Sequence, residues 1–108
     1  MSEANIYRIA FAQQNQVYEV YVKHVYQGEL YGFVVLEDFL FGEKSAIVVD
    51  PSEEKLRGEF ESVQRCFVPM HAIFRIDQVK KRGTAKITAL PSSGSKAKTV
   101  YSPEKKQP

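Results

Sequence analysis

Alternating apolar and polar positions predict that most of this chain folds as β-strands. In residues 17–26, the even positions from Tyr18 to Tyr26 share one mainly apolar face, whereas Glu19 and Lys23 lie on the other face. This period of two is typical of a half-buried strand, and it places His24 on the apolar face as an expected hydrogen-bonded core histidine. The other predicted strands are residues 6–11, 30–36, 46–49, 59–68, 72–79 and 84–88.

Residues 30–36 are apolar on both faces, so this predicted strand needs cover on both sides. Gly32 within the segment suits a sharply curved strand. Together with Phe39, Leu40 and Phe41, the segment offers more hydrophobic surface than one small domain needs. The pattern therefore favours a homo-oligomer formed through residues 30–41.

One short helix is predicted between the strands. Asp50 is suited to cap a helix, Pro51 fits the first helical position, and Gly58 fits the residue after the last turn. These signals predict a helix over residues 51–57.

The order of these elements predicts a mainly β fold. About six short strands with one inserted helix favour a small antiparallel barrel or a strongly bent sheet. At 108 residues the chain has room for one domain, which we place at residues 1–90. Residues 91–108 are rich in Ser, Pro and Lys and predict a basic, disordered tail.

Charge is divided unevenly along the chain. Residues 1–79 carry 7 Lys plus Arg against 12 Asp plus Glu, whereas residues 80–108 carry 8 against 1. Such a basic segment can follow a phosphate backbone by releasing counterions. A solubilising tail, or a tail that docks on the acidic body, is the alternative explanation of the same pattern.

Other features argue against an enzyme or a membrane protein. Cys66 is the single cysteine, which excludes an internal disulfide and favours a reducing compartment. Two distant histidines and one cysteine give no metal-ligand spacing, and no nucleotide-binding or nucleophile motif is present. The first residues lack a signal sequence, and no apolar run approaches the length of a membrane span. We therefore predict a cytoplasmic protein that is not an enzyme and needs no cofactor or metal.

Two resemblances add to this interpretation. With Tyr-Gly-Phe-Val at residues 31–34 and Val-Pro-Met-His-Ala-Ile-Phe-Arg-Ile-Asp at residues 68–77, the chain resembles an uncharacterised bacterial family, domain of unknown function 1820, across residues 5–88. This resemblance implies no function.

The chain also resembles, more faintly, the Sm-like (Hfq-like) barrels, which share their general form with SH3-like folds. The residues that carry this resemblance are the run from Gly28 to Phe33, then Asp38 and Phe39, and the His-Ala-Ile string at residues 71–73. It implies subunits that close into rings and bind single-stranded RNA, with His71 and Phe39 as RNA contacts.

The sequence as a whole predicts a nucleic-acid-binding domain, with RNA favoured over DNA. Phosphate contacts are expected from Lys80, Lys81, Arg82 and Lys86. Base contacts are expected from His71, Phe39 and Tyr31. The alternative is a protein-interaction or homo-oligomeric assembly module that binds no nucleic acid.

Overall fold

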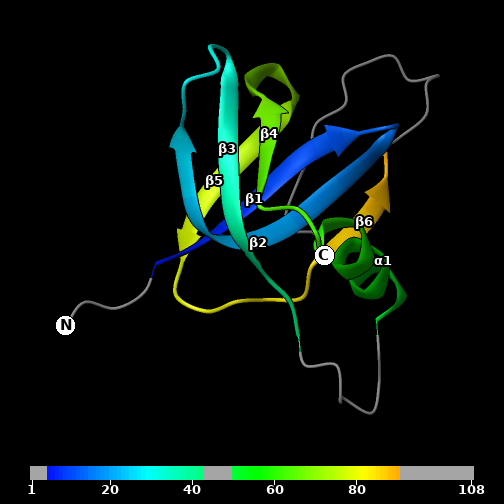
Figure 1. Ribbon diagram of the computed structural model, residues 1–108. Helices are drawn as coiled ribbons and strands as arrows, with labels where there is room; N and C mark the ends of the chain where they lie inside the picture. Colours follow the sequence, from blue (N-terminus) through cyan, green and yellow to red (C-terminus); the bar gives the residue numbers. More distant parts are fainter. Residues whose placement is uncertain (1–4, 43–49, 91–108) are drawn as a thin grey trace.

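A computed structural model describes residues 5–42 and 50–90, which form one antiparallel sheet and one helix (Figure 1). The strands are β1 (Ile6–Gln13), β2 (Gln16–Gln27), β3 (Phe33–Leu40), β4 (Arg65–Pro69), β5 (Ile73–Val79) and β6 (Lys86–Ala89). The helix α1 spans Pro51–Phe60, and a single 3₁₀ turn, Met70–Ala72, joins β4 to β5. The predicted strand at residues 46–49 and the predicted tail at residues 91–108 lie outside the described residues.

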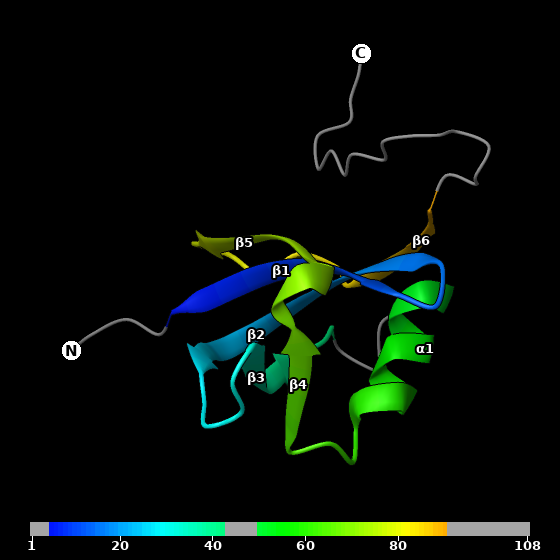
Figure 2. The same ribbon diagram turned by 90° about the horizontal axis from the view of Figure 1, so that it is seen from above.

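The long strand β2 organises the sheet. The strand order is β4-β3-β2-β1-β5, and β6 pairs with the first residues of β2. On the side of β2 away from β1, β6 pairs with residues 16–19 and β3 with residues 21–27, so the two strands lie end to end. The sheet is strongly curved but not closed (Figure 2). Of the two predicted architectures, the bent sheet is therefore confirmed.

The bend corrects the prediction for His24. Asp38 of β3 has a φ of 63°, which interrupts the regular alternation of the strand opposite β2. Beyond this point Val25 packs against the core, and the side chain of His24 is 56% exposed. Nε2 of His24 lies 3.2 Å from Oδ2 of Asp38, so the histidine has a polar partner at the surface and is not a core residue.

The helix begins as predicted but ends later. The carboxylate of Asp50 accepts the N–H groups of Ser52 and Glu53, at 2.9 and 3.2 Å. The helix continues through Gly58 to Phe60, because Leu56 and Phe60 lie four residues apart and are both buried in the core. The prediction that Gly58 terminates the helix was wrong, since the packing of Phe60 outweighs the helix-breaking tendency of glycine.

The start of β3 also differs from the prediction. Residues 30–32 form a turn, in which Phe33 donates its N–H to the Leu30 carbonyl at 3.2 Å. Gly32 has a φ of 82° and serves this turn instead of a curved strand. Similarly, only the last part of the predicted strand 59–68 is extended, because the preceding residues belong to α1 and to the turn after it.

The core lies between the sheet and α1, which covers one face (Figure 2). Alternate residues of β1, β2 and β3 fill it, together with Leu56, Phe60, Val68 and Ala85. On the other face of β3, Val35 is only 1% exposed and pairs with Tyr26 and Phe67 across the strands. Val34, Val35 and Leu36 of β3 are thus buried within a single copy of the chain, whereas Phe33, Phe39 and Leu40 are half-buried.

Candidate functional site

Two side chains of α1 hold the end of β3 and the start of β6 together. The Glu53 carboxylate, 8% exposed, accepts the Gly42 N–H through Oε1 at 3.3 Å and the Ala85 N–H through Oε2 at 3.0 Å. One helical turn later, Nη2 of Arg57 donates to the Gly42 carbonyl at 2.7 Å. Both polar groups of Gly42 are therefore bound by side chains of the helix. This junction fixes the position of the connection between β5 and β6.

That connection crosses the face of the sheet opposite to α1. Val20 and Val22 point into the core, so Tyr21 between them points to the opposite face. A Cβ atom added to Gly83 would lie 2.5 Å from the Tyr21 hydroxyl oxygen, which shows that the connection rests on this tyrosine. Burial is the main cause that raises the pKa of Tyr21.

Further cations lie on the same face as Tyr21. In the strand register Arg8 is paired with Tyr21, Arg75 is paired with Ala10, and Lys86 is paired with Glu19. Paired residues of antiparallel strands point to the same face. The connection between β5 and β6 adds three more cations to these. We call the whole set the basic face: it consists of Arg8, Arg75, Lys80, Lys81, Arg82 and Lys86.

The acidic side chains of this face do not cancel its charge. Oδ2 of Asp77 lies 2.9 Å from Nη2 of Arg8 and 3.0 Å from Nε of Arg75, so one carboxylate is shared by two guanidinium groups. The hydrogen bond from Arg8, followed by that from Arg75, lowers the pKa of Asp77. Glu19 is buried. Counted over its six cations and these two carboxylates, the face keeps an excess of positive charge.

The structure groups the predicted site residues in three places. Lys80, Lys81, Arg82 and Lys86 are all exposed and belong to the basic face. Tyr31 is 99% exposed in the turn before β3, and the neighbouring residue Gly32 accepts the Met70 N–H at 2.8 Å. Tyr31 and the exposed His71 therefore lie near each other. Strand β5 separates them from Lys80 by about 20 Å, because each strand residue adds about 3.3 Å.

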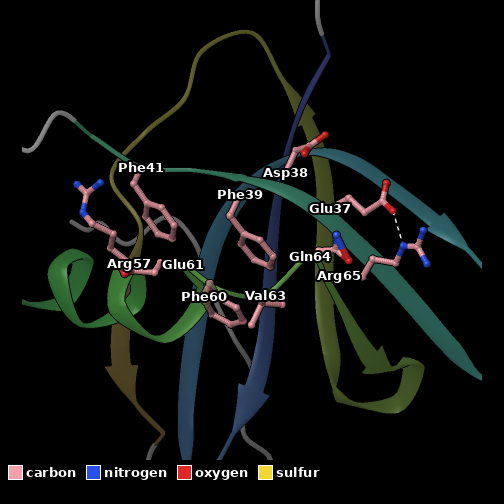
Figure 3. A pocket seen from close by; sticks show the side chains of 10 residues that line it. All are labelled: Glu37, Asp38, Phe39, Phe41, Arg57, Phe60, Glu61, Val63, Gln64 and Arg65. Carbon is pink, nitrogen blue, oxygen red and sulfur yellow. Dashed lines mark hydrogen bonds and ion pairs between the residues drawn. The ribbon is translucent and has the colours of Figure 1, made fainter.

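Phe39 lies in a third place, inside an aromatic pocket. Its ring stacks on Phe60, with centroids 4.4 Å apart and an interplanar angle of 11°. Phe41 lies nearly parallel to Phe39, with centroids 6.5 Å apart. These rings line a pocket of about 430 Å³ between α1 and β3 (Figure 3). The remaining lining residues are Glu37, Asp38, Arg57, Glu61, Val63, Gln64 and Arg65.

Most charged groups of the aromatic pocket have partners in the fold. Oε2 of Glu37 accepts from the Tyr26 hydroxyl at 2.8 Å and from Nε of Arg65 at 2.7 Å. These two hydrogen bonds, that of Tyr26 first, lower the pKa of Glu37. Nε of Arg57 pairs with Oε2 of Glu54 at 3.2 Å, and its guanidinium lies 5.4 Å from the Phe41 ring centroid.

The sequence interpretation missed Arg8, Arg75 and the polar residues of the pocket. The alternation of β5 places Arg75 and Asp77 on one face, which is a usable signal for Arg75, whereas the position of Arg8 beside them depends on the pairing of β1 with β5. No local signal places Glu61 and Gln64 in the same pocket as Phe39, because the pocket depends on how α1 packs against β3.

The single cysteine and the possible metal ligands were considered next. Burial raises the pKa of the Cys66 thiol, which disfavours the reactive thiolate. Residues 5–42 and 50–90 contain no group of three or more His, Cys, Asp or Glu side chains placed to hold a metal ion. Within the same residues, no helix is both long and apolar enough to cross a membrane.

One protein family matches most of this chain. The family model described as a domain of unknown function, DUF1820, matches residues 5–101. The chain belongs to the DUF1820 family. This confirms the first resemblance found in the sequence. No curated protein and no solved structure matches the chain. The resemblance of this DUF1820 protein to Sm-like barrels therefore stays a prediction, and its basic face and aromatic pocket must be interpreted from their own chemistry.

Proposed function

We propose that this DUF1820 domain binds single-stranded RNA through its basic face and catalyses no reaction. The observation that supports the proposal most is the position of residues 80–83. The connection that contains them lies across the sheet face that also carries Arg8, Arg75 and Lys86. Cations from four separate segments thus meet on one face of an otherwise acidic domain.

Such a face suits a flexible phosphate chain. Lys and Arg side chains bind phosphates mainly by releasing counterions, and this type of binding needs no sequence-specific contact. Proteins that read duplex DNA commonly insert a helix into the major groove. In the described part of this chain the cations of the basic face lie on strands and on a connection, not on a helix. A single strand lying across the curved sheet is therefore the favoured ligand.

Two variants of the full chain with equal net charge test the proposal. The face variant replaces Lys80, Lys81, Arg82 and Lys86 by Gln. The tail variant replaces Lys96, Lys98, Lys105 and Lys106 by Gln. Each variant loses four positive charges, so a general charge effect acts equally on both. Binding to a fluorescein-labelled, mixed-sequence RNA 12-mer is measured by fluorescence anisotropy at several salt concentrations.

The face variant is expected to bind at least about tenfold more weakly at low salt, and its log–log salt slope is expected to fall by about 3. The tail variant should stay closer to the wild type in both quantities. If only the tail variant loses affinity, binding belongs to the tail and the proposal fails. Absence of binding by the wild-type chain rejects the RNA proposal altogether.

An assembly module is the second candidate function. Leu30 and Tyr31 are 48% and 99% exposed at the start of the segment 30–41, and exposed Phe67 lies near Leu30 beside a shared pocket. Burial of these side chains by a second copy would stabilise a homo-oligomer. Replacing Leu30 and Tyr31 by Ser should then convert an oligomer into a monomer in sedimentation velocity. A wild-type chain that sediments as a monomer at high concentration would exclude this candidate.

A further inference from the structure

A small pocket lies at one end of the sheet, at the start of β1 and the end of β2. Figure 2 shows the start of β1 between the ends of β2 and β5. The pocket has a volume of about 220 Å³, which is smaller than the ~300–1,000 Å³ of sites for drug-sized ligands and leaves room for a single ring system. We call it the tyrosine pocket; its lining residues are Asn5, Tyr7, Lys23, His24, Val25 and Tyr26.

The tyrosine pocket adjoins the basic face at this end of the sheet. Tyr7 directly precedes Arg8 in β1. Nε2 of Gln78 donates to Oδ1 of Asn5 at 3.1 Å, and Gln78 stands two residues before Lys80. Because neighbouring strand residues point to opposite faces, an RNA strand on the basic face would reach the pocket around the end of the sheet, at Asn5 and Lys80.

The charge of the tyrosine pocket suits a polyanion. The described residues that line it include Lys23 and His24 but no carboxylate. Within residues 5–42 and 50–90, the Lys23 ammonium has no hydrogen-bond or ion-pair partner. The aromatic pocket, by contrast, is lined by three carboxylates and two guanidinium groups. A strand of RNA is therefore favoured at the tyrosine pocket over the aromatic pocket.

Two aromatic rings give the tyrosine pocket a surface on which a base can stack. Tyr26 is 41% exposed, and its hydroxyl donates to Oε2 of Glu37 at 2.8 Å, which restrains the ring. This hydrogen bond is made at the edge of the ring, so it does not occupy the ring faces. Tyr7 and Val25 are half-buried against the core and form the inner part of the pocket. Stacking between an aromatic side chain and a base contributes substantially to single-strand binding and suits any base.

We propose that the tyrosine pocket holds one base of the bound RNA, stacked on Tyr26 with Tyr7 as the second aromatic wall, while Lys23 and the basic face bind the neighbouring phosphates. This inference rests on the proposed RNA-binding function and adds a base contact to it. Because stacking needs no particular base edge, the pocket raises the affinity for a strand that carries bases without selecting a sequence.

Two labelled 9-mers with the same number of phosphates test this proposal. One is oligouridine, and the other has the same ribose-phosphate backbone with every base replaced by hydrogen. Fluorescence anisotropy at one low salt concentration measures the binding of both probes to the full-length wild type and to three variants, Tyr26→Leu, Tyr26→Phe and Tyr31→Leu. Tyr26→Phe keeps the ring and removes the hydroxyl, whereas Tyr31→Leu removes an aromatic ring that is 99% exposed outside the pocket.

The wild type, Tyr26→Phe and Tyr31→Leu are expected to bind oligouridine about tenfold more tightly than the abasic strand. Tyr26→Leu should lose most of this preference and keep its affinity for the abasic strand. Equal binding of the two probes by the wild type would overturn the base pocket but leave phosphate binding by the basic face intact. A preference that survives in Tyr26→Leu would also overturn the base pocket. If the wild type binds neither probe, the base pocket and the RNA-binding proposal fail together.

A second measurement uses the wild type alone and so does not depend on how any variant folds. Oligouridine that contains 4-thiouridine is crosslinked to the full-length chain with long-wave ultraviolet light, and the modified residues are identified by mass spectrometry. Crosslinks at Tyr7 or Tyr26 are expected. Crosslinks found solely outside residues 5–7 and 23–26 would overturn the base pocket.

Discussion

Replacing Glu53 by Ala is expected to destabilise the junction that positions both the basic face and the aromatic pocket. The Glu53 carboxylate is the acceptor for the N–H groups of Gly42 and Ala85. Alanine keeps the helix but leaves both donors without this acceptor. Because Ala85 is 0% exposed, water cannot easily replace the lost hydrogen bond.

The expected loss can be worked out from these two donors. An unsatisfied buried N–H costs about 1–3 kcal/mol, which applies to Ala85. Gly42 is only half-buried, so its lost hydrogen bond is expected to cost about 0.5–1.5 kcal/mol. The free energy of unfolding should therefore fall by about 1.5–4.5 kcal/mol in Glu53→Ala.

Urea unfolding followed by far-UV circular dichroism measures this loss. Glu54→Ala is the matched control, because Glu54 is the next residue of the same helix turn and its carboxylate, 44% exposed, pairs with Arg57. An exposed pair of this kind contributes about 0.2–0.5 kcal/mol. The reasoning is refuted if the two variants differ by less than about 0.5 kcal/mol, since that result would mean that the buried hydrogen bonds of Glu53 add little.

Three further variants test other parts of the structure. Gly83→Ala should lower the free energy of unfolding by about 1–3 kcal/mol, because its Cβ would lie 2.5 Å from the Tyr21 hydroxyl oxygen. Gly58→Ala should raise the free energy of unfolding by about 0.5–1 kcal/mol, because no atom lies within 4 Å of the added Cβ and alanine favours the helix. Urea unfolding measures the change in both glycine variants. Equal effects of the two substitutions would contradict the described contacts. Since Arg8 lowers the folded-state pKa of Asp77, the stabilisation by this carboxylate is present above its unfolded-state pKa and is lost as the pH falls through the folded-state value. Asp77→Asn should therefore be less stable than the wild type at pH 7 and approach it in acid, and a constant difference from pH 7 to pH 2 would argue against the ion pair.

Local patterns in the sequence were sufficient to predict most strands and the start of the helix. The period of two is strong in residues 17–26, and Asp50 with Pro51 marks the helix start unambiguously. The bend at Asp38 could not be predicted, because a non-glycine residue with positive φ is held by its tertiary surroundings. The late end of α1 was missed for a related reason, since it depends on Phe60 stacking against Phe39 from another segment.

The candidate sites were predictable only where their residues are neighbours in the sequence. The run of cations at residues 80–82 is visible directly in the chain. The contribution of Arg8 depends on the pairing of β1 with β5, where it meets Asp77, 69 residues away. The aromatic pocket combines residues from β3, α1 and the segment after it, so its composition follows from the packing of the helix.

The measurement that tests the central claim most directly is a nuclear magnetic resonance titration of the full chain, labelled with ¹⁵N, with single-stranded RNA. RNA binding by the basic face predicts that amide shifts concentrate at residues 80–86, on Arg8 and on Arg75, and that these shifts diminish at high salt. Shifts confined to residues 91–108, or to the turn at residues 30–32, would contradict the proposal that the folded domain binds RNA through this face.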